Sequence, residues 1–315
     1  MSSFWKNKKV LVVGGAGFIG SHTVDALIER GARVAVIDRH ALPKRKYSNN
    51  PPRLYKLDAT SSAAVGRIFR REKPEFVMNF AALVSVPRSI LEPQNDARSI
   101  TAMLNILENS VKFRVKKILY SSSGFIYGNA ERLPTPESSP MQPLNPYNIS
   151  KAACESYLRF FQAQHNLPFV ILRYATVYGP RRTGGAMPDY IRKIISGAPV
   201  EIYGKKTRDY IFISDVVRAN LMALEKSIGG VEPVFNIGSG KETGLRELHD
   251  LIAKLLGKGR VKPRLLPALS GEVDRMRLDV RKAKRALGFA AHISLKAGLA
   301  QTIAWHAAEI NKIRI

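Results

Sequence analysis

Cysteine is almost missing from this sequence, because Cys154 is the only one in 315 residues. A single cysteine excludes a disulfide framework within the chain and is typical of a reducing compartment. No apolar run approaches the length that crosses a bilayer, and the residues before the first predicted strand contain no signal-peptide core. We therefore expect a cytoplasmic protein without a membrane segment.

Acidic residues are also scarce. Lys and Arg number 50 against 25 Asp and Glu, so the formal net charge is +25. Such a charge suggests nucleic acid as a partner. The basic residues are spread evenly, however, with 22 in residues 1–150 and 28 in residues 151–315. They form no basic tail and are not interleaved with aromatic residues. We interpret them as a basic surface that attracts anionic substrates, and we do not expect nucleic acid to bind.

Histidine is rare as well, and none of the six lies at metal-ligand spacing from Cys or acidic residues. We expect no metal site. Hydrophobic residues are not lacking, since they make up 45% of the chain. This length and composition predict a globular protein with one large domain and a smaller one.

A glycine-rich loop follows the first predicted strand. Residues 10–13 are an aliphatic run typical of a buried parallel strand, and a helix is predicted to follow Gly20. In dinucleotide folds the first glycine, here Gly14, permits a sharp turn. Gly17 lets the backbone approach a pyrophosphate, and Gly20 lets helix and strand pack closely. The pyrophosphate would then lie on the N–H groups at the helix start.

Acidic residues end the next two predicted strands. Asp38 follows the strand over residues 33–37, where a carboxylate can accept both ribose hydroxyls of NAD and repels the 2′-phosphate of NADP. NAD is therefore the predicted cofactor, although Arg39 leaves acceptance of NADP open. Asp58 ends the third strand. It can accept the exocyclic amine of an adenine or cap the helix that begins near Ser61, and both interpretations stay open.

Strands and helices alternate five times before residue 121. This alternation predicts an α/β fold with a doubly wound parallel sheet, the Rossmann arrangement. Ligands of such sheets bind across the carboxyl ends of the strands. The glycine loop, Asp38, Asp58, Ala81 and Ser123 should converge there.

Tyr147 and Lys151 are four residues apart in a predicted helix that runs to about His165. Residues at this spacing share one helix face, so an ammonium can lie beside a phenol. That proximity favours the phenolate and lowers the tyrosine pKa toward the working range, which makes Tyr147 a candidate general base.

The regular alternation ends near residue 176. We predict an NAD-binding domain over residues 1–176, to which residues 208–240 return. Residues 177–207 and 241–315 would form a smaller, interwoven α/β domain that binds the substrate.

Together these motifs resemble the extended short-chain dehydrogenase/reductase family, in its NAD-dependent epimerase/dehydratase branch. The resemblance runs over nearly the whole chain, and several motifs in the right order make chance an improbable explanation. The matching segments are residues 14–20, 81–82, 121–128, 146–151, 173–181, 208–210 and 236–238.

The resemblance implies a mechanism. Tyr147 would be the base, Lys151 would lower its pKa and hold the nicotinamide ribose, and Ser123 would hydrogen-bond the reacting hydroxyl. In the 4-epimerases of the branch, the sugar C4 hydride passes to NAD⁺ and returns to the other face of the 4-keto sugar. The expected NAD contacts are Gly14, Gly17, Phe18, Ile19, Gly20, Asp38, Arg39, Asp58, Ala59, Ala81, Ala82, Ser99, Tyr147 and Lys151.

The resemblance also implies a nucleotide-sugar substrate. Arg208 matches an arginine that binds the diphosphate, a role suited to a planar cation with several donors, although a surface salt bridge is the alternative. Tyr203 falls where the nucleotide base is contacted. Thr176 stands where an Asn commonly holds the phosphate, and Leu269 replaces a phosphate-binding Arg for which Arg275 or Arg277 could substitute. The expected substrate contacts are Ser123, Tyr147, Thr176, Tyr203, Arg208 and Arg275.

Gly124 and Phe125 decide the predicted reaction type. The related dehydratases and decarboxylases carry an acidic residue there, because elimination needs an additional acid/base group. We therefore predict epimerisation at C4 of a UDP-hexose of the UDP-glucose/UDP-galactose type. A nucleotide-sugar reductase, an epimerase acting at another carbon, and a non-catalytic NAD-binding or RNA-associated protein are the alternatives. The resemblance further implies a homodimer formed through helices near residues 97–112 and 147–165.

Overall fold

The computed structural model describes residues 3–43, 50–82, 86–259, 261–268 and 271–313. Leu269 lies outside the described residues. The chain divides into two compact units. Unit 1 comprises residues 1–126, 145–173 and 217–235, and unit 2 comprises residues 127–144, 174–216 and 236–315. In the described part of the chain, no helix has the length and apolar character needed to cross a membrane.

Unit 1 is organised around a seven-stranded sheet in the order β11-β6-β5-β4-β1-β2-β3. Its strands are β1 (Lys9–Val13), β2 (Arg33–Asp38), β3 (Arg53–Lys56), β4 (Phe76–Asn79), β5 (Lys117–Ser123), β6 (Phe169–Tyr174) and β11 (Val234–Ile237). The strand pairs from β3 across to β5 are all parallel. The order reverses between β1 and β4, and in doubly wound sheets this switch point is where ligands bind. The predicted fold class is confirmed.

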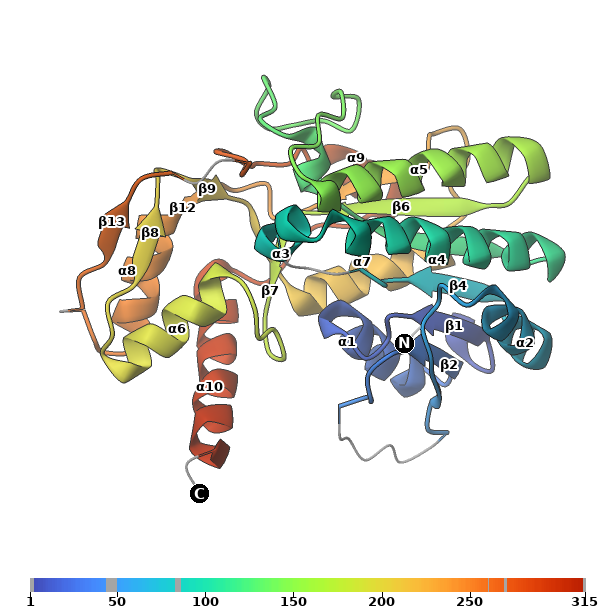
Figure 1. The fold of residues 1–315 in the computed structure, drawn as a ribbon, viewed down its shortest axis with the longest axis horizontal. Coiled ribbons are helices and arrows are strands. Elements are labelled where there is room, and N and C mark those ends of the chain that lie inside the picture. Colours follow the sequence, from blue (N-terminus) through green and yellow to red (C-terminus); the bar gives the residue numbers. More distant parts are fainter. Residues whose placement is uncertain (1–2, 44–49, 83–85, 260, 269–270, 314–315) are drawn as a thin grey trace. The chain divides into compact units, whose positions relative to one another are not determined.

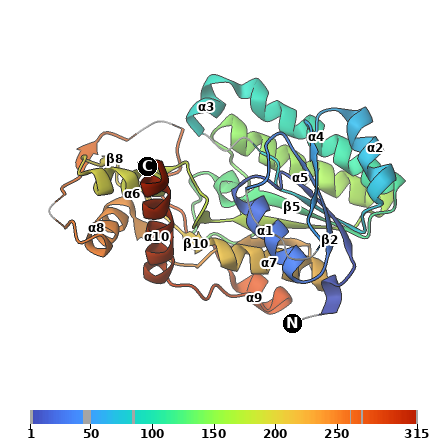
Figure 2. The same cartoon turned by 90° about the horizontal axis from the view of Figure 1, so that it is seen from below.

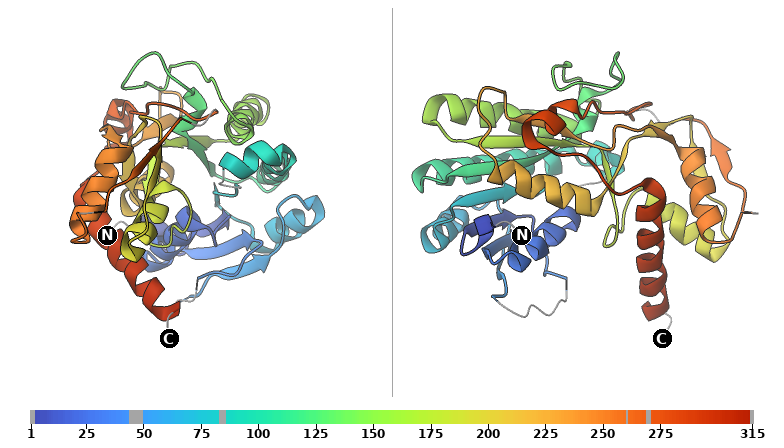
Figure 3. Two further views of the ribbon diagram at one scale, coloured as in Figure 1. Left: turned by 60° about the vertical axis from the view of Figure 1, so that its left-hand side comes forward. Right: turned by 180° about the vertical axis from the view of Figure 1, so that it is seen from behind.

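Helices cover both faces of this sheet (Figure 1). One face carries α2 (Ser62–Glu72), α4 (Pro93–Lys112) and α5 (Pro146–His165), with α3 (Val86–Leu91) before α4. The opposite face carries α1 (Phe18–Glu29) and α7 (Ile213–Glu225), as the view from below and the view from behind both show (Figures 2 and 3). Short 3-10 helices lie at η1 (Ser3–Trp5) and η2 (Gly124–Tyr127).

The strand residues alternate between the two faces, and this alternation builds the core. Leu11 and Val13 of β1 are buried on the side of α2, α4 and α5, in a cluster that includes Phe69, Ile106 and Leu158. Strands buried on both faces carry near-continuous apolar sequences, which is why β1 is recognisable from its residues alone.

Unit 2 is assembled from short strands and helices. β7 (Thr176–Tyr178) pairs with β10 (Tyr210–Phe212), β9 (Thr207–Arg208) with β12 (Thr243–Gly244), and β8 (Glu201–Tyr203) with β13 (Arg264–Leu266). The helices are α6 (Ala186–Ser196), α8 (Leu245–Leu255), α9 (Arg281–Leu287) and α10 (Leu295–Ile313).

Candidate active site

At two glycines between the end of β1 and the first turn of α1, the backbone packs too closely for any side chain. Gly14 has a φ of +78°, and a Cβ there would lie 2.6 Å from the backbone nitrogen of Ala81. A Cβ on Gly20 would lie 2.1 Å from the carbonyl oxygen of Gly14. Gly17 precedes α1 and has no side chain to cap the first helical turn. The loop therefore fits a dinucleotide pyrophosphate bound at a helix N-terminus.

Asp38 lies beside this loop at the carboxyl end of β2. One carboxylate oxygen accepts a hydrogen bond from the Ala16 N–H at 2.9 Å, and the other accepts from the His40 N–H at 2.9 Å. The structure thus brings Asp38 to the glycine loop, as predicted.

Asp58 follows β3 but does not cap α2. The N-cap of α2 is Ser61, and Asp58 instead accepts the N–H of Thr60 at 3.0 Å and a guanidinium N–H of Arg98 at 2.7 Å. The interpretation of Asp58 as the helix cap is therefore wrong. Burial opposes ionisation of this carboxyl, but the hydrogen bonds from Thr60 and Arg98 outweigh it, so the pKa of Asp58 is lowered. Arg39 lies 3.9 Å from the same carboxylate.

The start of α5 fixes the position of Tyr147. The side chain of Asn145 caps the helix by accepting the N–H of Asn148 at 3.0 Å, and Pro146 occupies the first helical turn. The N–H of Tyr147 donates to Ser89 Oγ at 2.8 Å, which ties this turn to α3. Tyr147 is thereby held half-buried in the first turn of α5.

Lys151 lies one helical turn further and is 3% exposed. Its Nζ is 5.8 Å from the ring centroid of Tyr147 and 4.8 Å from that of Tyr120 on β5. Burial lowers the pKa of Lys151 to about 8, against the influence of Cys154 and Glu155, which favour its charged form. The predicted pairing of an ammonium with the Tyr147 ring on one helix face is present.

Three consecutive serines end β5. The carbonyl oxygen of Ser121 accepts a hydrogen bond from Lys151 Nζ at 2.5 Å, and Ser121 Oγ donates to the Asn79 carbonyl at 2.9 Å. The hydroxyl of Ser123 accepts the Phe125 N–H at 3.2 Å. Lys151 Nζ therefore connects the helix that carries Tyr147 to the strand that carries Ser123.

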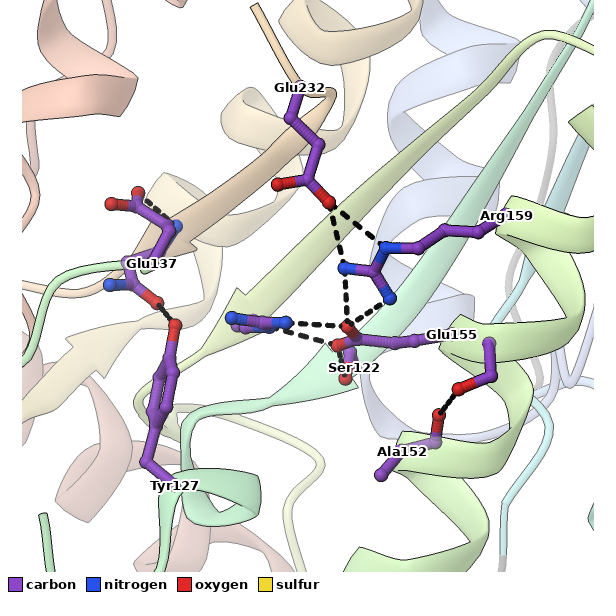
Figure 4. Close-up of polar contacts among 10 residues, drawn as sticks. Ser122, Tyr127, Glu137, Ala152, Glu155, Arg159 and Glu232 are labelled. Carbon is purple, nitrogen blue, oxygen red and sulfur yellow. Dashed lines mark hydrogen bonds and ion pairs between the residues drawn. The ribbon is translucent and has the colours of Figure 1, made fainter. Parts of the chain in front are cut away.

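Three residues near this site were not predicted from the sequence. Ser122 Oγ donates to the Glu155 carboxylate at 2.6 Å (Figure 4). Arg173 Nη2 donates to the same carboxylate at 2.7 Å. Glu155 is fully buried and Arg173 is 2% exposed. The sequence signal was the position of Glu155, four residues after Lys151 and hence on the same helix face.

In unit 2, Thr176 and Arg208 lie near each other, because Thr176 pairs in register with Tyr210 of the strand that follows Arg208. The Arg208 side chain is 11% exposed and donates to the Thr207 carbonyl at 2.8 Å. Glu272 is 4.0 Å from its guanidinium. Thr176 Oγ1 is buried and has no hydrogen-bond partner among the described residues. Thr176 on β7 and Arg208, two residues before the partner strand β10, therefore bring an unsatisfied hydroxyl and a planar cation into the same part of unit 2.

Arg275 is 62% exposed in its side chain and forms a two-point ion pair with Glu242, at 2.8 and 2.9 Å. This pairing, more than any other effect, lowers the pKa of Glu242 to about 2. Glu242 also accepts a hydrogen bond from Thr207, which precedes Arg208. Arg277 differs from Arg275, since its buried Nε has no partner in the part of the chain that the structure describes.

Tyr203 ends β8, where its hydroxyl donates to Glu201 at 3.3 Å and its backbone pairs with Leu266 of β13.

Asp209 was not predicted to have a role, yet it is fully buried. Its carboxylate accepts both the N–H and the hydroxyl of Ser239, at 2.8 and 2.7 Å. Asp209 therefore fixes the turn after β11 next to Arg208.

No group of three or more His, Cys, Asp or Glu within the described ranges could hold a metal ion.

The sequence matches the NAD dependent epimerase/dehydratase family over residues 10–238. It is 32% identical over 307 residues to the UDP-glucose 4-epimerase of Mycolicibacterium smegmatis, in a match that covers 94% of this chain and 97% of that protein. The structure resembles that of the Thermotoga maritima UDP-glucose 4-epimerase with UDP-glucose. The TM-score is 0.89 at 38% identity, over 96% of this chain and 99% of the other.

A third comparison concerns the cofactor. The UDP-glucose 4-epimerase of Thermus thermophilus in complex with NAD superposes with a TM-score of 0.85 at 32% identity, over 95% of this chain and 98% of the other. The chain belongs to the NAD-dependent epimerase/dehydratase family. The predictions of a Rossmann fold, of NAD as the cofactor and of NAD-dependent nucleotide-sugar epimerisation are confirmed.

Proposed function

We propose that the chain interconverts the C4 epimers of a UDP-hexose, with UDP-glucose and UDP-galactose as the simplest pair. The observation that carries this proposal is the buried Lys151 ammonium, which lies against the ring of Tyr147 and bonds to the strand that ends in Ser123. The similarity to a T. maritima structure that holds UDP-glucose supports the choice of substrate.

In the proposed reaction, Tyr147 takes the proton from the sugar 4-hydroxyl and later returns it. The positive charge of Lys151 stabilises the phenolate that this role requires. Ser123 hydrogen-bonds the same hydroxyl and keeps it in line with the phenol. NAD held by the glycine loop and Lys151 would supply the acceptor of the sugar hydride and, once reduced, its donor. Because proton and hydride both return, the reaction has no net oxidation.

We assign the cofactor contacts according to the sheet edge on which they lie. The glycine loop and the start of α1 would hold the pyrophosphate, the ends of β2 and β3 the adenosine, and the residues after β4, in α4 and in α5 the nicotinamide ribose. In this order the proposed contacts are Gly14, Gly17, Phe18, Ile19, Gly20, Asp38, Arg39, Asp58, Ala59, Ala81, Ala82, Ser99, Tyr147 and Lys151.

We assign the substrate diphosphate to unit 2. Arg208 can present several N–H donors to phosphate oxygens, and the unsatisfied hydroxyl of Thr176 can donate beside it. Tyr203 is proposed to contact the nucleotide base. Arg277 suits a phosphate better than Arg275, because Glu242 already occupies the Arg275 guanidinium. The predicted domains, residues 1–176 with 208–240 for NAD and 177–207 with 241–315 for the substrate, differ from the two compact units, because Thr176 and Arg208 belong to unit 2.

Epimerisation is favoured over elimination by the residues that follow Ser123. Gly124 and Phe125 begin the short helix η2, and neither side chain can transfer a proton. A dehydratase or decarboxylase would need an additional acid/base group at this position. Proton transfer by Tyr147 alone is sufficient for reversible oxidation at one carbon.

The substrate test uses the purified chain with UDP-glucose, UDP-galactose, UDP-N-acetylglucosamine and UDP-glucuronate. We expect NMR to show the C4 epimer of at least one sugar. The absorbance of reduced nicotinamide should show no net formation of NADH. Stoichiometric consumption of added NADH would indicate a reductase. A product inverted at another carbon would identify an epimerase of different regiochemistry. If every UDP-, GDP-, CDP- and dTDP-sugar is returned unchanged, the proposed activity is wrong.

We further propose that the protein is a homodimer formed through α4 and α5, which lie side by side in unit 1 (Figure 1). Ile149, Tyr157 and Phe160 are 53%, 37% and 54% exposed, and their spacing puts them on one face of α5. Large apolar residues gathered on one exposed helix face are typical of an interface.

The substitution Phe160→Glu should convert the dimer to a monomer, because a carboxylate would have to be desolvated at the interface. Size-exclusion chromatography with light scattering measures the mass directly. Gln162→Glu adds the same charge at another exposed position of α5 and should leave the dimer intact. A wild-type monomer, or a Phe160→Glu protein that remains dimeric, would contradict the proposed interface.

We place the enzyme in the cytoplasm. The support is the single cysteine, Cys154, which is buried and forms no disulfide within the chain. A chain with one buried thiol gains nothing from an oxidising compartment. Fractionation of cells that produce the chain would test this assignment.

A further inference from the structure

Glu155 is a fully buried carboxylate in the middle of α5. One of its oxygens accepts Ser122 Oγ at 2.6 Å (Figure 4) and Arg173 Nε at 3.0 Å, and the other accepts Arg173 Nη2 at 2.7 Å. Desolvating two charges is expensive, and apolar residues of similar volume often serve a fold equally well. Packing alone therefore does not account for an ion pair at this place.

The hydrogen bonds of Glu155 join the elements that carry the proposed catalytic groups. Ser122 is on β5 directly before Ser123, and Glu155 is on α5 one turn beyond Lys151. Lys151 binds the carbonyl of Ser121, so two successive residues of β5 are tied to α5 one helical turn apart. These two hydrogen bonds fix the position of β5 along the axis of α5 and its orientation about that axis. Arg173 adds the neighbouring strand β6 to the same carboxylate.

We propose that Glu155, held in place by Arg173, is a positioning residue that sets the Ser123 hydroxyl against Tyr147 and Lys151 through its hydrogen bond with Ser122. This inference rests on the proposed catalytic roles of Ser123, Tyr147 and Lys151. Glu155 acts through Ser122 and through its charge, and it does not touch the substrate.

The same carboxylate acts on Lys151 electrostatically. The groups that face Lys151 are Tyr147, Cys154 and Glu155 of its own helix and Tyr120 of β5. Of these, Cys154 and the Glu155 carboxylate both favour the protonated lysine, against the burial that lowers its pKa. The charged groups that face Glu155 itself are Lys151, Arg173 on β6 and Arg159 on its own helix.

Arg159 lies at the outer side of this network. Its side chain is 34% exposed, it reaches Glu155 only at 3.4 Å, and it pairs with Glu232 at 2.9 Å (Figure 4). The shortest hydrogen bonds of Glu155 are therefore those from Ser122 on β5 and from Arg173 on β6.

The primary test is Ser122→Ala, which removes only the hydroxyl between β5 and Glu155 and leaves the Glu155–Arg173 pair satisfied. We expect kcat for C4 epimerisation to fall about tenfold or more, because misplacement of a catalytic group by about 1 Å can reduce a rate up to ~100-fold. KM and the amount of bound NAD should stay unchanged, since the substitution does not alter the proposed binding residues. The matched control is Ser156→Ala, whose hydroxyl donates to the Ala152 carbonyl of its own helix at 3.3 Å.

A second variant, Glu155→Gln, removes the negative charge of residue 155 and keeps the size and shape of its side chain. It should move the alkaline limb of the pH–kcat profile to lower pH, because Lys151 loses the carboxylate that favours its proton. A structural role alone would lower the amount of folded enzyme without moving that limb.

The inference is overturned if Ser122→Ala has the kcat of the wild type, or if folded Glu155→Gln keeps the alkaline limb in place. If the proposed function is wrong, the wild-type enzyme will epimerise no nucleotide sugar. This result is obtained before any variant is tested. That result would overturn the inference as well.

Discussion

The Tyr147→Phe enzyme should lose turnover by a factor of about 1,000 or more and still bind NAD. General acid–base groups contribute roughly 10²- to 10⁴-fold, and here one phenol both takes and returns the proton. The phenyl ring keeps the packing of the first turn of α5, which Asn145 and Pro146 define without the phenol. The measurement is kcat for C4 epimerisation, together with the NAD released from denatured protein.

Tyr157→Phe is the matched control for this experiment. Tyr157 is on the same helix and is 37% exposed, so loss of its hydroxyl should leave kcat unchanged. A Tyr147→Phe enzyme with more than a tenth of the wild-type turnover would exclude Tyr147 as the base. Loss of NAD together with turnover would instead assign Tyr147 to cofactor binding.

The parts of the fold that could be predicted are those whose residues alone determine local structure. The first strand is an aliphatic run, and α5 ends at His165 as predicted. β5 contains apolar residues near its start but continues through three serines to Ser123. Serine has no strong preference for strands. These serines are held in the strand by partners distant in sequence, such as Asn79 and Glu155, which no local pattern reveals.

The same distinction applies to the candidate site: contacts within one helix could be predicted, and contacts between distant segments could not. Spacing in one helix was enough to bring Lys151 to Tyr147, because four residues make about one turn. The partner of Asp58 is Arg98, 40 residues away, and this contact could not be read from the sequence. The strands of unit 2 are two or three residues long, which is too short for an alternation pattern to show. The contacts of Thr176 and Arg208 depend on those strands and therefore required the structure.

The kcat/KM of the wild-type enzyme should fall about tenfold for each pH unit above a midpoint near pH 8. Burial lowers the pKa of Lys151 to about 8, so the ammonium is present below that pH and is lost as the pH rises through it. The neutral amine no longer stabilises the Tyr147 phenolate, and because the two groups interact, the midpoint is a property of the pair. The measurement is kcat/KM for UDP-glucose from about pH 6 to 10, which reports groups of the free enzyme.

Unfolding would not explain this alkaline loss, because the contribution of Lys151 to stability changes in the opposite direction. Its pKa is lowered in the folded chain from 10.5 to about 8, and burial lowers the pKa of Lys117 to about 8 as well. Between about pH 8 and 10.5 the unfolded chain therefore binds more protons, and these two lysines contribute more stability as the pH rises. Thermal melts of the same samples separate the two effects.

Lys151→Arg provides the decisive comparison, since arginine stays charged over the whole range. We expect its activity to be about 100-fold lower than that of the wild type, because the larger guanidinium cannot take the ammonium's place at the Ser121 carbonyl and under the Tyr147 ring. The activity that remains should show no decline near pH 8. If the decline persists in Lys151→Arg, another group titrates there and Lys151 does not set the alkaline limit.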